Sequence, residues 1–331
     1  MKKEFTDKHV LMVNNLTVKF YTYAGVVHAV SKVSFEVYKN EIVALVGETG
    51  SGKTVTTRAI TRLIESPGRI EEGEILFRRR NNKIVDLMKI SDEEIRRIRG
   101  DEIAYIFQDP TSALDPLYTI GEHIDETIKD HRFIDKKIIK KISIDLLRKV
   151  GIPNPEIRIK NYPHEMSGGM RQRSVISISL SNEPVLLIAD EPTTNLDVTI
   201  QAQILDLLKE LVKERGMSMI LITHNLGIVA EVADRVYIMY AGKIVESGDV
   251  YKIFSRPLHP YTQMLLRAVP NPLKKIIKLE TIPGTIPSLI DPPSGCRFHP
   301  RCPFTKDICI KQEPPMIEAE KNHYVACWLY K

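Results

Sequence analysis

The stretch that decides the fold is Gly47-Glu48-Thr49-Gly50-Ser51-Gly52-Lys53-Thr54. It fits the pattern of two glycines with four residues between them, followed by a lysine and a hydroxyl residue. Glycines let backbone amides wrap a phosphate, and a helix that begins at Lys53 presents its positive end to it. Lys53 then reaches the β- and γ-phosphates and Thr54 coordinates Mg²⁺. The pattern predicts an ATP site rather than a structural glycine-rich turn.

The segments around this loop indicate an α/β domain with a parallel sheet. Nearly all-apolar runs are typical of strands buried on both faces, and they occur at 41–46, 103–107, 185–189 and 219–223. A more polar strand pattern covers 11–20. Helical patterns separate the runs, at 55–63, 136–150 and 199–215. The phosphate-binding loop therefore lies where its chemistry requires, between a buried strand and a helix.

Two acids, Asp190 and Glu191, end one of the apolar runs. Asp190, at the carboxyl end of the strand, is suited to holding Mg²⁺ through its water shell. Glu191, one step further, is placed to orient or deprotonate an attacking water molecule. Such a pair can also be an ordinary helix cap, but after a phosphate-binding loop the catalytic interpretation is favoured.

Composition limits the location of the chain. Its 331 residues are 27% charged and 43% hydrophobic with a formal net charge of +5, and no run approaches the roughly 18 apolar residues of a membrane span. The N-terminus lacks a secretory signal. We expect a cytosolic chain with only a peripheral membrane role. Arg78-Arg79-Arg80 precedes two asparagines, a polar turn rather than a nucleic-acid patch.

A further motif makes the prediction specific. Met166-Ser167-Gly168-Gly169-Met170 resembles the signature loop of ATP-binding cassette ATPases, with Met166 and Met170 in place of the usual Leu and Gln. In that family the loop caps the γ-phosphate of ATP that a second, facing subunit holds. Ser167 and the two glycines offer a hydroxyl and close-approaching amides, the groups of an anion site.

Four weaker resemblances follow in the family's order. Gln108 is similar to the loop glutamine that touches Mg²⁺ and relays to a membrane partner, and His224 to the switch histidine at the γ-phosphate. Asn195-Leu196-Asp197 resembles the loop that crosses the dimer interface. Tyr23 is our choice for the aromatic that stacks on adenine, with Tyr21 as the rival. A lone glutamine or histidine at a strand end is more often only a cap or a surface group, so the order of the motifs over residues 23–224 carries the prediction.

The resemblance implies a RecA-like P-loop NTPase core with an antiparallel β subdomain and an α-helical subdomain. The ATPase domain would cover 8–255, with its core at 8–107 and 181–255 and the helical subdomain at 108–180. It also implies that two subunits sandwich two ATP molecules. Glu191, His224 and Lys53 would be catalytic, while Thr54, Gln108 and Asp190 would hold Mg²⁺.

The remaining residues, 256–331, form a Pro-rich extension that contains all four cysteines, Cys296, Cys302, Cys309 and Cys327. Their spacing leaves an iron-sulfur cluster, structural zinc, disulfides and free thiols open. The segments 256–266, 282–284 and 295–303 resemble those of oligopeptide and dipeptide importers. That resemblance implies a [4Fe-4S] cluster, with Zn²⁺ as the alternative.

The expected function is that of an ATP-hydrolysing subunit of a di- or oligopeptide importer at the cytoplasmic face of the membrane. Its implied partners are a second ATPase subunit, a paralogue in a heterodimer, together with two permease subunits and an external substrate-binding protein. The same engine could import oligosaccharides or nickel chelates. A soluble cassette ATPase acting on DNA or ribosomes is disfavoured, because neither a second cassette nor a long coiled coil is present.

Overall fold

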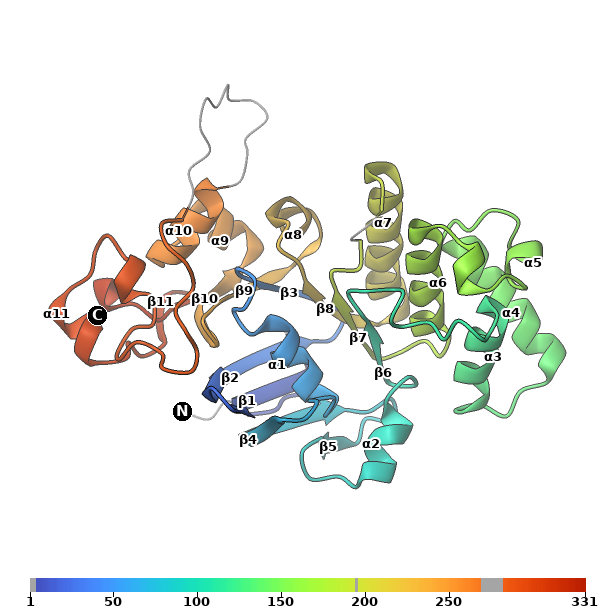
Figure 1. The fold of residues 1–331 in the computed structure, drawn as a ribbon, viewed down its shortest axis with the longest axis horizontal. Coiled ribbons are helices and arrows are strands. Elements are labelled where there is room, and N and C mark those ends of the chain that lie inside the picture. Colours follow the sequence, from blue (N-terminus) through green and yellow to red (C-terminus); the bar gives the residue numbers. More distant parts are fainter. Residues whose placement is uncertain (1–3, 194–195, 269–281) are drawn as a thin grey trace.

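The computed structural model describes residues 4–193, 196–268 and 282–331, which form two β-sheets flanked by helices (Figure 1). The strands are β1 His9–Thr22, β2 Gly25–Tyr38, β3 Ile42–Val46, β4 Gly68–Arg78, β5 Ile84–Asp86, β6 Ile103–Ile106, β7 Leu186–Asp190, β8 Ser218–Ile222, β9 Arg235–Tyr240, β10 Lys243–Asp249, β11 Ile317–Glu320 and β12 His323–Val325. The α-helices are α1 Lys53–Ile60, α2 Asp92–Ile98, α3 Ile120–Lys129, α4 Lys136–Lys149, α5 Pro155–Arg158, α6 Gly168–Leu180, α7 Val198–Arg215, α8 Leu226–Val232, α9 Val250–Ser255, α10 Pro260–Arg267 and α11 Asp307–Lys311.

The larger sheet has the order β11-β12-β10-β9-β3-β8-β7-β6, and its strands from β9 to β6 are parallel. Every residue of β3, β7 and β8 is buried. In β3, Ile42, Ala44 and Val46 join one apolar cluster, whereas Val43 and Leu45 join the other. The sheet is therefore covered on both faces, as its continuous apolar runs predict. The four expected buried strands are confirmed, with ends that differ by one residue.

The smaller sheet is antiparallel, in the order β2-β1-β4-β5. Its strands β1 and β2 are each 14 residues long and are interrupted by register shifts. Its apolar face packs toward the larger sheet with α1 between them, because Leu11, Val30 and Phe77 share a cluster with Ile60 and Leu45. The antiparallel sheet that the resemblance implies is therefore present.

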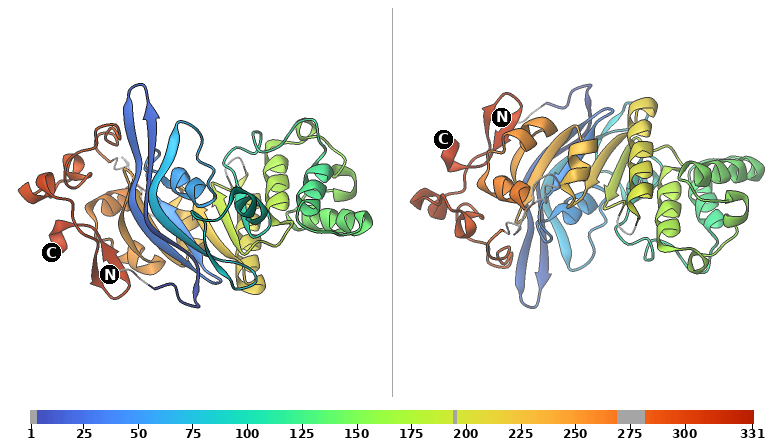
Figure 2. Two further views of the ribbon diagram at one scale, coloured as in Figure 1. Left: turned by 90° about the horizontal axis from the view of Figure 1, so that it is seen from below. Right: turned by 90° about the horizontal axis from the view of Figure 1, so that it is seen from above.

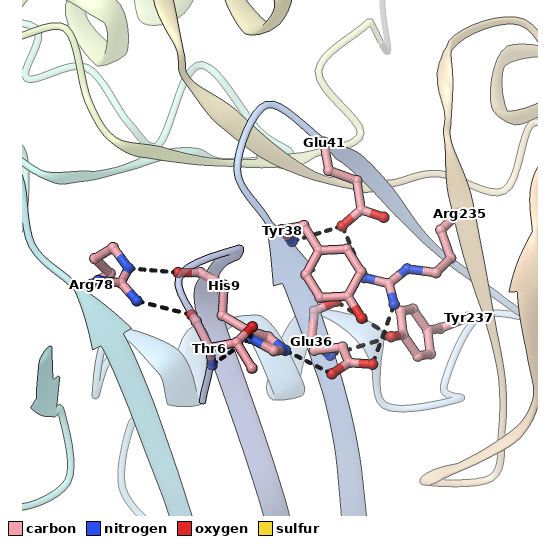
Figure 3. A network of polar contacts seen from close by, with 8 residues as sticks. All are labelled: Thr6, His9, Glu36, Tyr38, Glu41, Arg78, Arg235 and Tyr237. Atoms are coloured by element: carbon pink, nitrogen blue, oxygen red, sulfur yellow. Dashed lines mark hydrogen bonds and ion pairs between the residues drawn. The ribbon is translucent and has the colours of Figure 1, made fainter. Parts of the chain in front are cut away.

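A buried polar network fastens the two sheets together at β9 (Figure 3). The Arg235 guanidinium donates to Glu41 Oε2 and to the Glu36 carbonyl oxygen, both at 2.8 Å, and lies 4.3 Å from the centre of the Tyr38 ring. His9 Nε2 lies 3.0 Å from Glu36 Oε2. One cation thus faces two carboxylates at the junction, and this pairing keeps buried charge compensated.

Residues 108–180 contain helices and loops only, namely α3 to α6 and one short 3₁₀ turn. A reciprocal cap begins α3, because Thr119 Oγ1 accepts from the Glu122 amide and Glu122 Oε2 accepts from the Thr119 amide. These helices and the C-terminal residues lie at opposite ends of the molecule in all three views (Figures 1 and 2).

The C-terminal residues are less separate than their composition indicates. Strand β12 pairs with β10, so that β11 and β12 extend the larger sheet. Phe298 is only 1% exposed and belongs to the main apolar cluster. Prolines and cysteines indicate loops correctly, but they give no signal that a loop residue reaches the core.

None of the helices in the described ranges has the length and apolar character needed to span a bilayer.

Candidate functional site

The loop 47–54 connects β3 to α1, at the carboxyl end of the central strand. Gly52 has φ +101°, and a Cβ atom there would come within 2.6 Å of the Ala29 carbonyl oxygen. A Cβ atom on Gly47 would come within 2.1 Å of the Met239 carbonyl oxygen. Both positions therefore exclude a side chain, which is the physical reason for glycine there. The helix that follows points its N-terminus at the loop, as an anion site requires.

Lys53 lies inside this loop, with 8% of its surface exposed. Its Nζ donates to the carbonyl oxygens of Gly47 at 2.7 Å and Glu48 at 2.9 Å. Burial lowers the pKa of Lys53, while the carboxylates of Glu191, Asp190 and Glu48 oppose that shift. The ammonium is thus held by the loop's own carbonyls at the place where phosphate oxygens would compete for it.

Asp190 ends β7 and is 2% exposed. Its carboxylate accepts a hydrogen bond from Tyr105 Oη at 3.2 Å. Burial raises the pKa of Asp190, and the hydroxyls of Thr54 and Tyr105 oppose the rise. Thr54 and Asp190 therefore bring a hydroxyl and a carboxylate oxygen together, the hard oxygen donors that Mg²⁺ prefers.

Glu191, the next residue, brings two other predicted positions together. His224 Nδ1 lies 2.9 Å from Glu191 Oε1, and Gln108 Nε2 donates to Glu191 Oε2 at 3.3 Å. The three side chains follow β7, β8 and β6, whose carboxyl ends share one edge of the sheet. Glu191 also has φ +49°, a conformation uncommon outside glycine and often found at functional sites.

The predicted signature loop lies at the start of α6. Ser167 is the N-cap residue, and its Oγ accepts from the Met170 amide at 3.3 Å. Ser167 is exposed, and a Cβ atom on Gly168 would meet nothing within 4 Å. The hydroxyl and the first helix amides are therefore accessible to an external group, and within the described residues no nucleotide-loop atom is bonded to them.

The structure also places the predicted adenine-stacking tyrosine and part of the predicted interface loop 195–197. Tyr23 lies between β1 and β2 and is fully exposed, whereas Tyr21 donates to Glu71 Oε1 at 2.9 Å. The free ring of Tyr23 remains the better candidate for stacking. Asn195 lies outside the described residues. Asp197, after it, caps α7 by accepting from the Ile200 amide.

The four cysteines are unbridged, so the disulfide alternative is not realised. Burial raises the pKa of the Cys296 thiol to about 11, and the neighbouring Cys327, Cys309 and Cys302 add to the rise. Nevertheless, within 4–193, 196–268 and 282–331 no three His, Cys, Asp or Glu side chains form a group able to hold a metal. The thiols are electrostatic neighbours, and the expected [4Fe-4S] site is not formed.

Sequence reasoning missed two residues at the nucleotide loop and the signature helix. Tyr105 connects Thr57 on α1 to Asp190, with Oη 3.0 Å from Thr57 Oγ1. Gln172, fully buried on α6, donates to the Pro192 carbonyl oxygen at 2.8 Å. This hydrogen bond connects α6, the helix that begins at the predicted signature loop, to Pro192, which follows Glu191. Neither residue has a motif of its own, and only the three-dimensional arrangement identifies it.

Comparison with known families gives two matches. The model described as "ABC transporter" matches residues 30–194, and the model described as "Oligopeptide/dipeptide transporter, C-terminal region" matches residues 245–309. The second match begins within β10, the strand that pairs with β12, and it ends before β11 and β12.

Individual relatives agree over nearly the whole chain. The dipeptide transport ATP-binding protein DppD of Bacillus subtilis is 50% identical over 97% of this chain and 94% of its own length. The oligopeptide transport ATP-binding protein OppD of the same organism is 49% identical over 97% and 88%. DppD of Escherichia coli is 47% identical over 93% and 92%.

Solved structures resemble the fold. A dimeric structure of the bacterial ABC transporter cassette MJ0796 has a TM-score of 0.65 at 25% identity, covering 72% of this chain and 98% of that one. CbiO1 of Clostridium perfringens, described as part of the ABC transporter complex cbiONQ, has a TM-score of 0.61 at 27% identity, covering 76% and 92%.

Proposed function

Since this chain belongs to the ATPase subunits of ATP-binding cassette transporters, we propose that it hydrolyses ATP to power the import of dipeptides or oligopeptides. The observation that carries the enzymatic part is the convergence of Gln108 and His224 on Glu191, beside the loop that holds Lys53. The import of peptides rests on the C-terminal match and on the relatives' names.

In the proposed mechanism each residue acts at a defined place. The amides of 47–54 and Lys53 bind the phosphates, and Thr54 and Asp190 would hold Mg²⁺, which when bound would supply positive charge beside the transferred phosphoryl group. Glu191 accepts a proton from the attacking water, and His224 orients Glu191 and the γ-phosphate. Gln108 reports the state of this site to the membrane partner.

One chain supplies only half of each proposed site. Ser167 is exposed at the start of α6 and the two glycines that follow it are half-buried, at the place where the γ-phosphate of ATP bound to a facing subunit would be capped. We propose that the facing subunit is a related chain and that the dimer closes on ATP and opens after hydrolysis.

The permease subunits would dock beside Gln108. The segment that follows it is exposed and carries apolar side chains, with Leu117 80% and Tyr118 47% exposed. Such exposed apolar groups are suited to receiving a helix of a membrane protein. This docking would place the chain at the cytoplasmic face of the membrane.

The function is tested by affinity purification of the tagged chain from the cells in which it naturally occurs. We expect the chain to copurify with two membrane subunits and its ATPase activity to rise when peptide-loaded binding protein is added to the reconstituted complex. Copurification with nucleic acid or ribosomes would contradict the proposal. If a binding protein loaded with an oligosaccharide or nickel chelate stimulates the ATPase and a peptide-loaded one does not, the chain is still an importer ATPase, but its transported solute is not a peptide.

For the cysteines we propose a [4Fe-4S] cluster, for which the support is the resemblance to peptide importers and the donor chemistry of four unbridged thiols, not the arrangement of these thiols in the described residues. Four thiolates are the donor set of such a cluster, although the thiols must move closer together to ligate it. Protein purified without oxygen is expected to absorb at about 400 nm and to lose this band and its iron on Cys302→Ser. Stoichiometric zinc in the same preparation would overturn the cluster.

A further inference from the structure

A side chain from the C-terminal residues reaches the phosphate-binding loop. Arg301 Nη1 donates to Glu48 Oε2 at 2.8 Å and Nη2 donates to Glu48 Oε1 at 3.2 Å. The Arg301 side chain is 5% exposed and that of Glu48 is 27% exposed. The pair is therefore bidentate and largely shielded from water, the geometry in which an arginine–carboxylate contact is strong and directional.

Glu48 is held at its main chain as well. Its amide donates to Tyr261 Oη at 2.9 Å, and its carbonyl oxygen accepts from Lys53 Nζ. Tyr261, on α10, is fully buried. One residue of the loop is thus fixed at amide, carbonyl and carboxylate, and two of these three contacts come from residues after 255.

The segment that carries Arg301 is held in place by several contacts with the rest of the molecule. Phe298 stacks edge-on against Tyr240, with ring centres 5.0 Å apart. Arg297 donates to the Ala241 carbonyl oxygen and to Ser31 Oγ. Arg301 also donates to the Pro283 carbonyl oxygen at 2.7 Å. These contacts set the guanidinium in place before any nucleotide arrives, so that Arg301 loses little freedom in holding Glu48.

We infer that Arg301 is a positioning residue for ATP binding, which fixes Glu48 and neutralises its charge beside the phosphates. The inference rests on the proposed binding of ATP at 47–54. Glu48 is an anion within a loop that must accept a triphosphate, so its charge opposes binding unless a cation compensates it. Arg301 supplies that cation from the C-terminal residues, between Cys296 and Cys302.

The test is a double-mutant cycle on the full chain, with the Kd for a fluorescent ATP analogue and the KM and kcat for ATP as readouts. Arg301→Ala is expected to raise Kd and KM about tenfold, because an uncompensated carboxylate then faces the phosphates, while kcat changes less. Glu48→Gln combined with Arg301→Ala is expected to recover most of that loss, and Arg301→Lys to be intermediate.

Arg256→Ala is the matched control, because it removes a guanidinium from the C-terminal residues that pairs with Glu320 and not with Glu48. It is expected to leave Kd within about twofold of wild type. Equal Kd values for Arg301→Ala and the wild-type chain would overturn the inference. So would a tenfold loss in Arg301→Ala that the Glu48→Gln change fails to restore, since that pattern means damage to the fold.

The two failures are distinguishable. If the wild-type chain binds and hydrolyses ATP but the Arg301 variants do so equally well, only the inference fails. If the wild-type chain itself does not bind ATP, the proposed function fails first.

Discussion

Replacing Glu191 by glutamine is expected to lower kcat for ATP about 10³-fold while ATP binding is retained. The change removes the carboxylate that His224 Nδ1 and Gln108 Nε2 approach, but it leaves Lys53, Thr54 and Asp190 untouched. Turnover therefore stops after the subunits have closed on the nucleotide. The measurements are phosphate release for turnover and size-exclusion chromatography with and without ATP for a trapped dimer.

Glu231→Gln serves as the control for this variant. Glu231 is exposed on α8, away from the site, and its substitution removes the same negative charge. It is expected to keep wild-type turnover. Undiminished phosphate release in Glu191→Gln would remove the role assigned to Glu191. Loss of ATP binding in that variant would show that the carboxylate acts in the ground state.

The parallel strands of the core were predictable because each can be recognised from its own short stretch of sequence. Each of β3, β7 and β8 contains an uninterrupted run of at least four apolar residues, which is the pattern expected of a strand buried on both faces. Strands β1, β2 and β4 are harder to predict. They mix buried and exposed residues with register shifts, so their period is irregular.

At the site, motifs identified the residues but not their mutual contacts. Gln108, Glu191 and His224 follow different strands, and their meeting depends on the parallel register of β6, β7 and β8. The Arg301–Glu48 pair is separated by 253 positions in the chain. A lone arginine between two cysteines has no local signal for such a partner. Long-range pairs of this kind come only from the assembled fold.

Gly52 is a position at which both the backbone conformation and the close approach of another strand limit the site. Gly52→Ala is expected to lower kcat/KM for ATP about 100-fold, because the start of α1 must shift by a fraction of an ångström or more. The added Cβ atom would lie 2.6 Å from the Ala29 carbonyl oxygen at a φ of +101°. Backbone atoms cannot rotate aside, so the unfolding free energy should also fall by about 3 kcal/mol.

Gly50→Ala separates backbone strain from crowding, because Gly50 has φ +83° but a Cβ atom there meets nothing within 4 Å. Gly50→Ala should add only backbone strain, which lowers the unfolding free energy by about 1 kcal/mol. Its loss of kcat/KM should be smaller than that of Gly52→Ala. Chemical denaturation and steady-state kinetics of both variants measure the two effects. If Gly52→Ala matched Gly50→Ala in both, crowding against Ala29 would not be what requires glycine at the start of α1. A larger loss in Gly52→Ala alone would mean that the β2 backbone at Ala29 limits where the start of α1, and therefore the bound phosphate, can lie.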